Sequence, residues 1–200
     1  MSIWQRTWRK VMPRRVLSLV SFIFEPKRLK ERRLAVLNHF KTADPELLEP
    51  EIREGLNYLK SNKYASFPFN WTKKYDNYFP KVYRDEEHQR LYVFFEGKRM
   101  YFPKRITEKE VIWAMRLIYR EQDSESPHLY LTADFQVEPD SIVVDAGVAE
   151  GNFALSVVEK AKKLILIECD EEWMEALKLT FAPWKEKVIF VEKFVSDIDS

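Results

Sequence analysis

The pattern of apolar and polar positions near the carboxyl end predicts a strand, a helix and a second strand in succession. Residues 142–144 form a short β-branched run with the character of a buried parallel strand, and the run ends on Asp145. Residues 152–160 then carry apolar side chains at helical spacing. A second apolar run, 164–167, ends on Glu168. We therefore expect one βαβ unit with an acidic residue at the end of each strand.

The same alternation continues toward the end of the chain. Asp170 stands before an amphipathic stretch, 171–181, in the position of a helix-capping residue. Pro183 ends that stretch, and residues 188–191 form a third apolar run. The order strand, helix, strand, helix, strand predicts the α/β fold class, in the form of a Rossmann-like βαβαβ half with a parallel sheet.

The upstream half of the chain has a different pattern. Residues 28–40 have helical spacing, and Asp44 followed by Pro45 predicts the start of a second helix that continues to residue 60. Residues 61–90 are rich in aromatic side chains and prolines and have no clear period. We interpret them as an ordered aromatic loop that packs over a core.

A hairpin and a capped helix are expected between that loop and the first parallel strand. Residues 91–102 contain two strand-like runs around Gly97 and Lys98, which predicts a type II′ turn with glycine in the first central position. Thr107 and Glu110 have the spacing of a capping box and predict a helix after them. The expected regions are a basic helical part (1–62), a middle part with loop, hairpin and helix (63–138) and the α/β half (139–200).

The turn after the first parallel strand favours an adenosyl ligand without phosphates. Gly147 and Gly151 form a G-x-x-x-G pattern, and glycines in this position let a ligand approach the backbone. The dinucleotide fingerprint G-x-G-x-x-G is absent because position 149 is Ala149, and Glu150 would repel a pyrophosphate. A P-loop is excluded because Asn152, not lysine, follows the second glycine. S-adenosylmethionine (SAM) remains, because its sulfonium cation tolerates nearby acids.

The spacing of the two strand-end acids suits a ribose. Glu168 lies 23 residues after Asp145, close to the separation at which an acidic residue accepts hydrogen bonds from ribose hydroxyls. The segments VVDAGVAEGNFAL and LILIECDEEW resemble the first half of an FkbM-type methyltransferase, a family of class I SAM-dependent enzymes. The resemblance covers roughly residues 139–200 and implies a partial class I methyltransferase fold.

The resemblance also implies roles for individual residues. Asp145 and the two glycines would line the methionine end of SAM, and Glu168 would hold the ribose. The reaction would be methyl transfer to an oxygen nucleophile of a saccharide or natural product, and no catalytic base is identified. The expected cofactor-binding residues are Asp145, Gly147, Ala149, Glu150, Gly151, Asn152, Glu168, Cys169 and, at the adenine, Asp197.

Only the first three of about seven class I strands are present in this sequence, which bears on activity. The strand that normally pairs with the outer edge of 142–145 is absent, and an open apolar edge is liable to aggregation. The hairpin at 91–102 or a second copy of the chain would cover this edge, or the sequence is a fragment. The alternative function is a non-catalytic remnant or interaction module.

Charge is spread unevenly along the chain. Residues 1–33 contain ten Lys/Arg and two Glu, a net charge of +8, which leaves −7 on the rest of a chain whose total is +1. The apolar run 16–24 is too short to span a membrane. Either the basic segment forms a helix that docks on its own protein, or it lies on an anionic membrane surface. Nucleic acid is the least favoured partner.

The remaining candidate residues are few. Cys169 is the only cysteine, so an internal disulfide is excluded and a reducing, cytoplasmic location is expected, at the inner face of the membrane if the basic segment binds lipid. Its expected role is that of a small hydrophobe beside Glu168. His128 precedes the first parallel strand and either approaches the ligand or makes a loop hydrogen bond. No metal site is expected.

Overall fold

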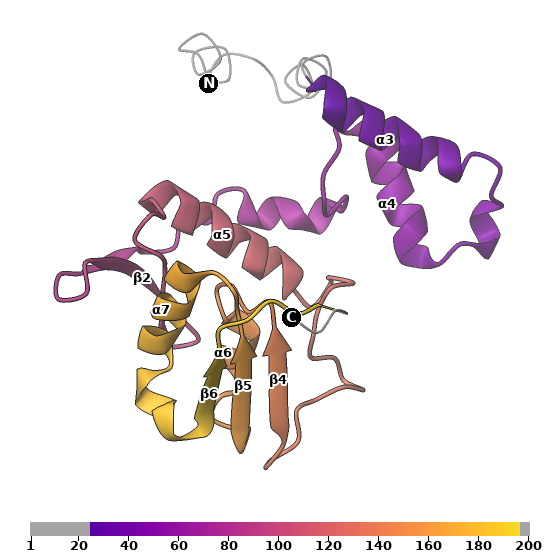
Figure 1. Ribbon diagram of the computed structural model, residues 1–200. Coiled ribbons are helices and arrows are strands. Elements are labelled where there is room, and N and C mark those ends of the chain that lie inside the picture. Colours follow the sequence, from indigo (N-terminus) through magenta and orange to yellow (C-terminus); the bar gives the residue numbers. More distant parts are fainter. Residues whose placement is uncertain (1–24, 197–200) are drawn as a thin grey trace, which may run out of the picture. The chain divides into compact units, whose positions relative to one another are not determined.

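A computed structural model describes residues 25–196 of the chain. The chain divides into two compact units between Lys74 and Tyr75 (Figure 1). The unit that begins at Tyr75 contains the hairpin, the long helix and the parallel strands together. The sequence instead suggested boundaries near residues 62 and 138.

Helices α3 (Lys27–His39) and α4 (Pro50–Ser61) contact each other in the first unit. The expected single helix from Asp44 to residue 60 is wrong, because Asp44 caps only the short 3-10 helix η1 (Pro45–Leu47). A proline is favoured in the first turn of a helix and not in its interior, so α4 begins anew at Pro50. A further 3-10 helix, η2 (Asn70–Tyr75), spans the division between the units.

A three-stranded antiparallel sheet opens the second unit. Strands β1 (Tyr83–Asp85), β2 (Arg90–Phe95) and β3 (Lys98–Tyr101) lie in that order. The expected aromatic loop therefore ends in a strand. The hairpin is confirmed, but its turn is not type II′. Phe95 pairs with Lys98, and the two residues between them both have positive φ, 49° at Glu96 and 77° at Gly97, which is the type I′ arrangement.

Helix α5 (Glu108–Glu121) begins at the predicted capping box. The Thr107 hydroxyl accepts from the amide of Glu110 at 3.4 Å, and the Glu110 carboxylate accepts from the amide of Thr107 at 2.8 Å. The amide of Thr107 thereby gains a partner, and the amide of Glu110, which also donates to the Thr107 carbonyl oxygen at 3.0 Å, gains a second one.

We expect Thr107→Ala to lower the free energy of unfolding by about 1 kcal/mol, because the capping hydroxyl of α5 is lost. Thr107→Ser keeps that hydroxyl and should cost only a few tenths of a kcal/mol. Urea denaturation followed by circular dichroism measures both variants. Equal destabilisation by alanine and serine would contradict the capping role.

The parallel sheet forms as predicted. Strand β4 (Ile142–Ala146) pairs with β5 (Lys163–Ile167), and β5 pairs with β6 (Val188–Val191), both in parallel. Helix α6 (Asn152–Val157) connects the first pair of strands. Helix α7 (Glu171–Thr180) and the 3-10 helix η3 (Ala182–Lys187) connect the second pair. The predicted α/β class with a Rossmann-like βαβαβ half is confirmed.

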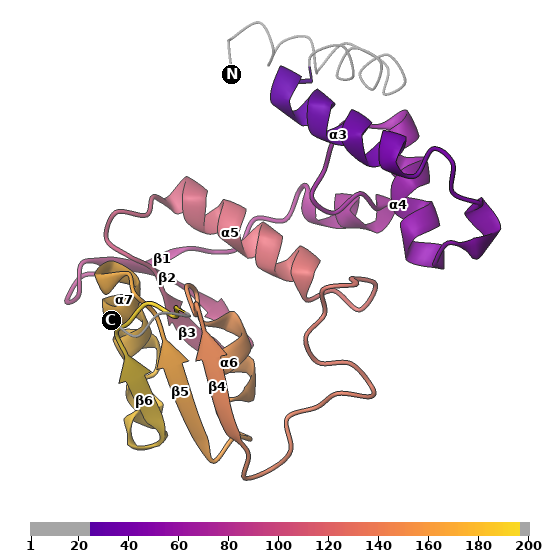
Figure 2. The same ribbon diagram turned by 45° about the vertical axis from the view of Figure 1, so that its right-hand side comes forward.

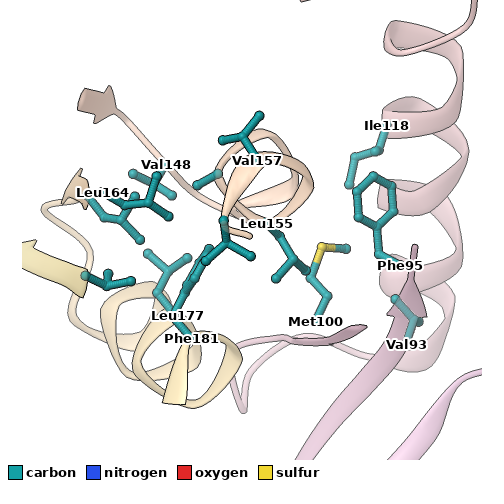
Figure 3. Packing of buried hydrophobic residues seen from close by; sticks show 14 of the residues in the cluster. Val93, Phe95, Met100, Ile118, Val148, Leu155, Val157, Leu164, Leu177 and Phe181 are labelled. Atoms are coloured by element: carbon teal, nitrogen blue, oxygen red, sulfur yellow. The ribbon is translucent and has the colours of Figure 1, made fainter. Parts of the chain in front are cut away.

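Helices α6 and α7 lie on the same face of this sheet, and no described helix covers the other face (Figures 1 and 2). Val148, Leu155 and Leu164 are buried on the covered side together with side chains of α7, the hairpin and α5 (Figure 3). On the other side, Ile142 and Val144 are 62% and 59% exposed. The expectation of a fully buried strand at 142–144 is therefore wrong, because this sheet is packed on one face only.

The outer edge of β4 pairs with no strand among residues 25–196. The hairpin does not cover it, because its strands belong to a separate sheet and β3 packs against helices α7 and α6. Arg90 of β2 forms an ion pair with Glu175 of α7, and the amide of Tyr101 donates to the Thr180 hydroxyl at 3.0 Å. No helix in the described part of the chain is long and apolar enough to cross a bilayer.

Candidate cofactor site at the strand ends

The loop between β4 and α6 follows the carboxyl end of β4, where open α/β sheets bind ligands. The amide of Gly147 donates to the carbonyl oxygen of Ile167 at 2.9 Å, so the loop starts beside the end of β5. Gly147, Ala149 and Gly151 all have positive φ, at 73°, 45° and 74°. Every second residue from 147 to 151 thus adopts the left-handed conformation.

The two glycines of this loop have different surroundings. A Cβ built on Gly147 would have no atom of another described residue, apart from its chain neighbours, within 4 Å. A Cβ on Gly151 would lie 2.7 Å from Cδ2 of Leu177 and 3.2 Å from Cε2 of Phe181. Gly147 therefore leaves space at the surface, whereas Gly151 lets the loop pack on α7. Of the two, only Gly147 offers the backbone to a ligand.

The Glu168 carboxylate holds this loop to the end of β5. Its Oε2 accepts from the amide of Ala149 at 3.0 Å, and its Oε1 accepts from the amides of Cys169 and Asp170, both at 2.8 Å. The side chain is buried. Burial alone would raise the pKa of Glu168, but the three amides together hold it below its ordinary value. Glu168 thus lies at the glycine turn, as its spacing from Asp145 predicted. Most of the hydrogen-bond acceptor positions of its carboxylate are taken by backbone amides.

Two further carboxyl groups at the turn, those of Asp145 and Glu150, lie in surroundings that disfavour their charged forms. Burial raises the pKa of Asp145, and the nearby Ala154 amide offsets this in part. Burial also raises the pKa of Glu150, and the charges of Glu121 and Glu168 raise it further. Three carboxyl groups therefore gather at the loop, and their negative charge favours a cationic ligand.

Sequence reasoning missed two residues near this loop, Tyr130 and Glu121. Burial and the charges of Glu121 and Asp145 raise the pKa of the Tyr130 phenol, and its ring packs edge-on against Phe153 at 5.4 Å. Tyr130 lies in an aperiodic segment, so no pattern pointed to it. Glu121 had a signal: it is the last residue of α5, where the helix dipole disfavours a carboxylate.

His128, two residues before Tyr130, is exposed. Its backbone amide donates to the Ser126 hydroxyl at 3.1 Å, in the local loop bonding that the sequence offered as one alternative.

The other predicted site residues have mixed placements. Asn152 opens α6, half-buried, beside Gly151. Cys169 lies beside Glu168 but is exposed, and desolvation, a hydrogen bond to Glu168 and the charge of that carboxylate raise the pKa of its thiol. Asp197 lies outside the described residues. Asp170 caps α7 as predicted, by accepting from the amides of Glu172 and Trp173. No group of three metal-ligating side chains occurs within the described range.

Comparisons with known proteins add little to this geometry. No family model and no curated protein match the sequence. Two solved structures are similar, Trm5b from Pyrococcus abyssi and the M. jannaschii tRNA m1G37 methyltransferase, at 12% and 15% identity and a TM-score of 0.33 each. They cover 69% and 77% of this chain, which spans 32% and 43% of theirs, less than half of either protein. A likeness of this size carries no conclusion, so the fold rests on the strand order and the site on its contacts.

Proposed function

We propose that the second unit is the cofactor-binding half of a class I SAM-dependent methyltransferase. The observation that carries the proposal is the open backbone at Gly147. This residue lies in the loop between β4 and α6, which is hydrogen-bonded to the end of β5. Ligands of open α/β sheets bind at this end of the strands, and a glycine without neighbours lets an adenosyl compound lie against the chain.

The charges around the loop support a methyl donor over a dinucleotide. Asp145 and Glu150 carry raised pKa values because their charged forms are desolvated. A sulfonium placed beside them would compensate those charges, whereas a pyrophosphate would add to them. This is the physical reason to prefer SAM to a nicotinamide or flavin dinucleotide.

Glu168 has fewer hydrogen-bond acceptor positions left for a ribose than the family resemblance implied. A carboxylate has about four acceptor positions, and three are taken by backbone amides. The Cys169 thiol makes a further hydrogen bond to this carboxylate. A ribose hydroxyl would therefore have to replace the Cys169 thiol at Glu168, while the three amides keep the loop in place.

The finer assignments rest on the sequence resemblance. They are an FkbM-type enzyme and an acceptor hydroxyl on a saccharide or natural product, with the hydroxyl proton leaving as the methyl group moves from sulfur to oxygen. The chain would position the donor, and alignment of donor and acceptor would provide most of the rate increase. A non-catalytic binding module stays the alternative. The membrane contact of residues 1–33, the cytoplasmic location and a second copy at the β4 edge also stay predictions.

Isothermal titration calorimetry of the full chain with SAM and S-adenosylhomocysteine tests the proposal. We expect both to bind, and Gly147→Ala to weaken both about tenfold or more, because its methyl group occupies the ligand's place. Gly97→Ala is the matched control: Gly97 has φ 77° and an equally open Cβ position, but it lies at the hairpin tip. Equal binding by Gly147→Ala and the wild type, or no heat with either ligand, would refute the assignment.

The pH dependence of binding distinguishes the contribution of the sulfonium charge from that of the rest of the ligand. Protonation of Asp145 and Glu150 occurs above their ordinary values of 3.8 and 4.5, because both pKa values are raised. As the pH falls from neutral toward the ordinary carboxyl range, we expect SAM to lose more affinity than S-adenosylhomocysteine, which lacks the sulfonium charge. Parallel losses for the two ligands would show that these carboxylates do not face the sulfur.

A further inference from the structure

A polar groove of about 690 Å³ lies in the first unit, along one face of α4. Arg53 and Asn57 line it from the helix, one turn apart, and Lys60 follows them in the same row of the helix surface. Asn70 lines the groove from the segment after the helix. The volume is that of a site for a small molecule.

Two asparagines of the groove are each held at the side-chain oxygen by a lysine. Oδ1 of Asn70 accepts from the Lys73 ammonium at 2.7 Å, and Oδ1 of Asn57 accepts more loosely from the Lys60 ammonium at 3.5 Å. An ammonium group can only donate, so it fixes the orientation of the carboxamide that it contacts. Both asparagines therefore offer their NH₂ groups, which are donors, to a ligand in the groove.

The charged side chains at the groove are mainly cationic. Arg53, Lys60 and Lys73 form no ion pair with another residue of the described chain. The Lys73 ammonium lies 5.8 Å from the ring centroid of Tyr58, which belongs to the lining. Among the described residues that line the groove, Glu54 is the only acid. Three positive charges thus stand against one negative charge.

The negative groups near the groove lie away from the two lysines or are already used. Glu49 and Glu51 stand at the start of α4, and Glu54 lies in the neighbouring row of the helix, one turn before Tyr58. At the end of the helix, the carbonyl oxygen of Tyr58 already accepts from the amide and from Nδ2 of Asn62, at 2.8 and 2.9 Å. The end of the groove near Asn62 is therefore rich in donors and in positive charge.

We propose that this end of the groove binds the phosphate group of a small ligand, between Asn57 and Asn70. The oxygens of a dianionic phosphate only accept, which suits two carboxamide NH₂ groups and two ammonium groups. A neutral sugar would gain no charge-assisted hydrogen bonds from the lysines, and a cation would be repelled by them. Soluble metabolites and lipid head groups share this phosphate chemistry. The inference does not depend on methyl transfer by the second unit.

Titration of the ¹⁵N-labelled full chain with glucose 6-phosphate and with dihexanoyl phosphatidic acid, at constant ionic strength, tests the inference. We expect at least one of them, at up to about 10 mM, to shift the amide resonances of residues 57–62 and 70–73. Glucose at the same concentration should leave them in place. Tighter binding of the sugar phosphate would identify a soluble ligand as the source, and tighter binding of the lipid would identify a head group.

Substitutions of the two lysines should weaken the binding. Lys60→Gln and Lys73→Gln should each reduce the affinity for the phosphate compound about threefold, because one positive charge beside the phosphate is lost. Glutamine forms helices about as well as lysine, so the effect of Lys60→Gln cannot come from unfolding of α4. Glu54→Gln should instead raise the affinity about twofold, because it removes a repelling charge from the groove.

Two controls make the result decisive. Lys30→Gln removes the same charge from an exposed position of α3, outside the groove, and should bind like the wild type. Gly147→Ala should also bind the phosphate compound normally, so failure of the methyltransferase proposal and failure of this one are distinguishable. The inference is overturned if neither phosphate compound shifts these resonances, if glucose shifts them equally, or if Lys30→Gln weakens binding as much as Lys60→Gln.

Discussion

Gly151→Ala should lower the free energy of unfolding of the second unit by roughly 3 kcal/mol. The new methyl group would lie 2.7 Å from Cδ2 of Leu177, a fully buried side chain in the helix α7. Overpacking of a dense core costs about 1–3 kcal/mol, and the left-handed backbone at φ 74° adds about 1 kcal/mol for any residue with a Cβ. Both costs apply here together, because Leu177 and Phe181 are confined by the rest of the core.

Gly147→Ala is the matched comparison for this prediction. Its φ of 73° is the same within a degree, but its Cβ would enter open space, so only the backbone cost of about 1 kcal/mol is expected. Chemical denaturation of the two variants side by side isolates the packing cost as their difference. Equal destabilisation would mean that α7 yields to the new methyl group, and the explanation for Gly151 would then fail.

This pair of glycines shows where sequence reasoning stops. Both were expected to line the ligand, because the family resemblance assigns both to the methionine end of SAM. The structure separates them by a contact with Leu177 and Phe181, which lie 26 and 30 residues further along the chain than Gly151. No local pattern encodes such a contact. Features with local causes were predicted well, such as the capping of α7 by Asp170 and the box at Thr107.

The candidate site follows the same division between local and tertiary causes. The strand ends at Asp145 and Glu168 came from short apolar runs and were found in place. Tyr130 and Glu121 reach the site through the fold, from a loop and from the end of α5. The pattern also could not predict that β4 is buried on one face only. A β-branched run of three residues is compatible with one buried face or with two.

Glu168→Gln should lower the free energy of unfolding by about 3 kcal/mol. The carboxylate accepts three backbone amides, and a carboxamide can offer only one oxygen to them. Its NH₂ group would face at least one amide N–H, which leaves a buried donor unpaired, and the charge assistance of all three bonds is lost. Because these bonds join the glycine loop to β5, we also expect faster hydrogen exchange at the amide of Ala149.

The stability difference between the wild type and Glu168→Gln should depend on pH in a direction that can be checked. The pKa of Glu168 is below 4.5 in the folded protein, so its stabilising contribution is complete above the unfolded value and disappears as the pH falls through the lowered one. The deficit of Glu168→Gln should therefore stay constant down to about pH 5 and shrink below pH 4.5.

Glu150→Gln is the control, because its expected effect on stability at neutral pH is opposite in direction to that of Glu168→Gln. Its raised pKa means that the charged form is disfavoured in the folded state, so this variant should match or slightly exceed the wild type in stability at neutral pH. That advantage should vanish as the pH falls to the ordinary carboxyl value, where Glu150 of the wild type is itself protonated. If Glu150→Gln were as damaging as Glu168→Gln at neutral pH, the loop would depend on negative charge in general. The three directed hydrogen bonds of Glu168 would then not explain how the turn is held.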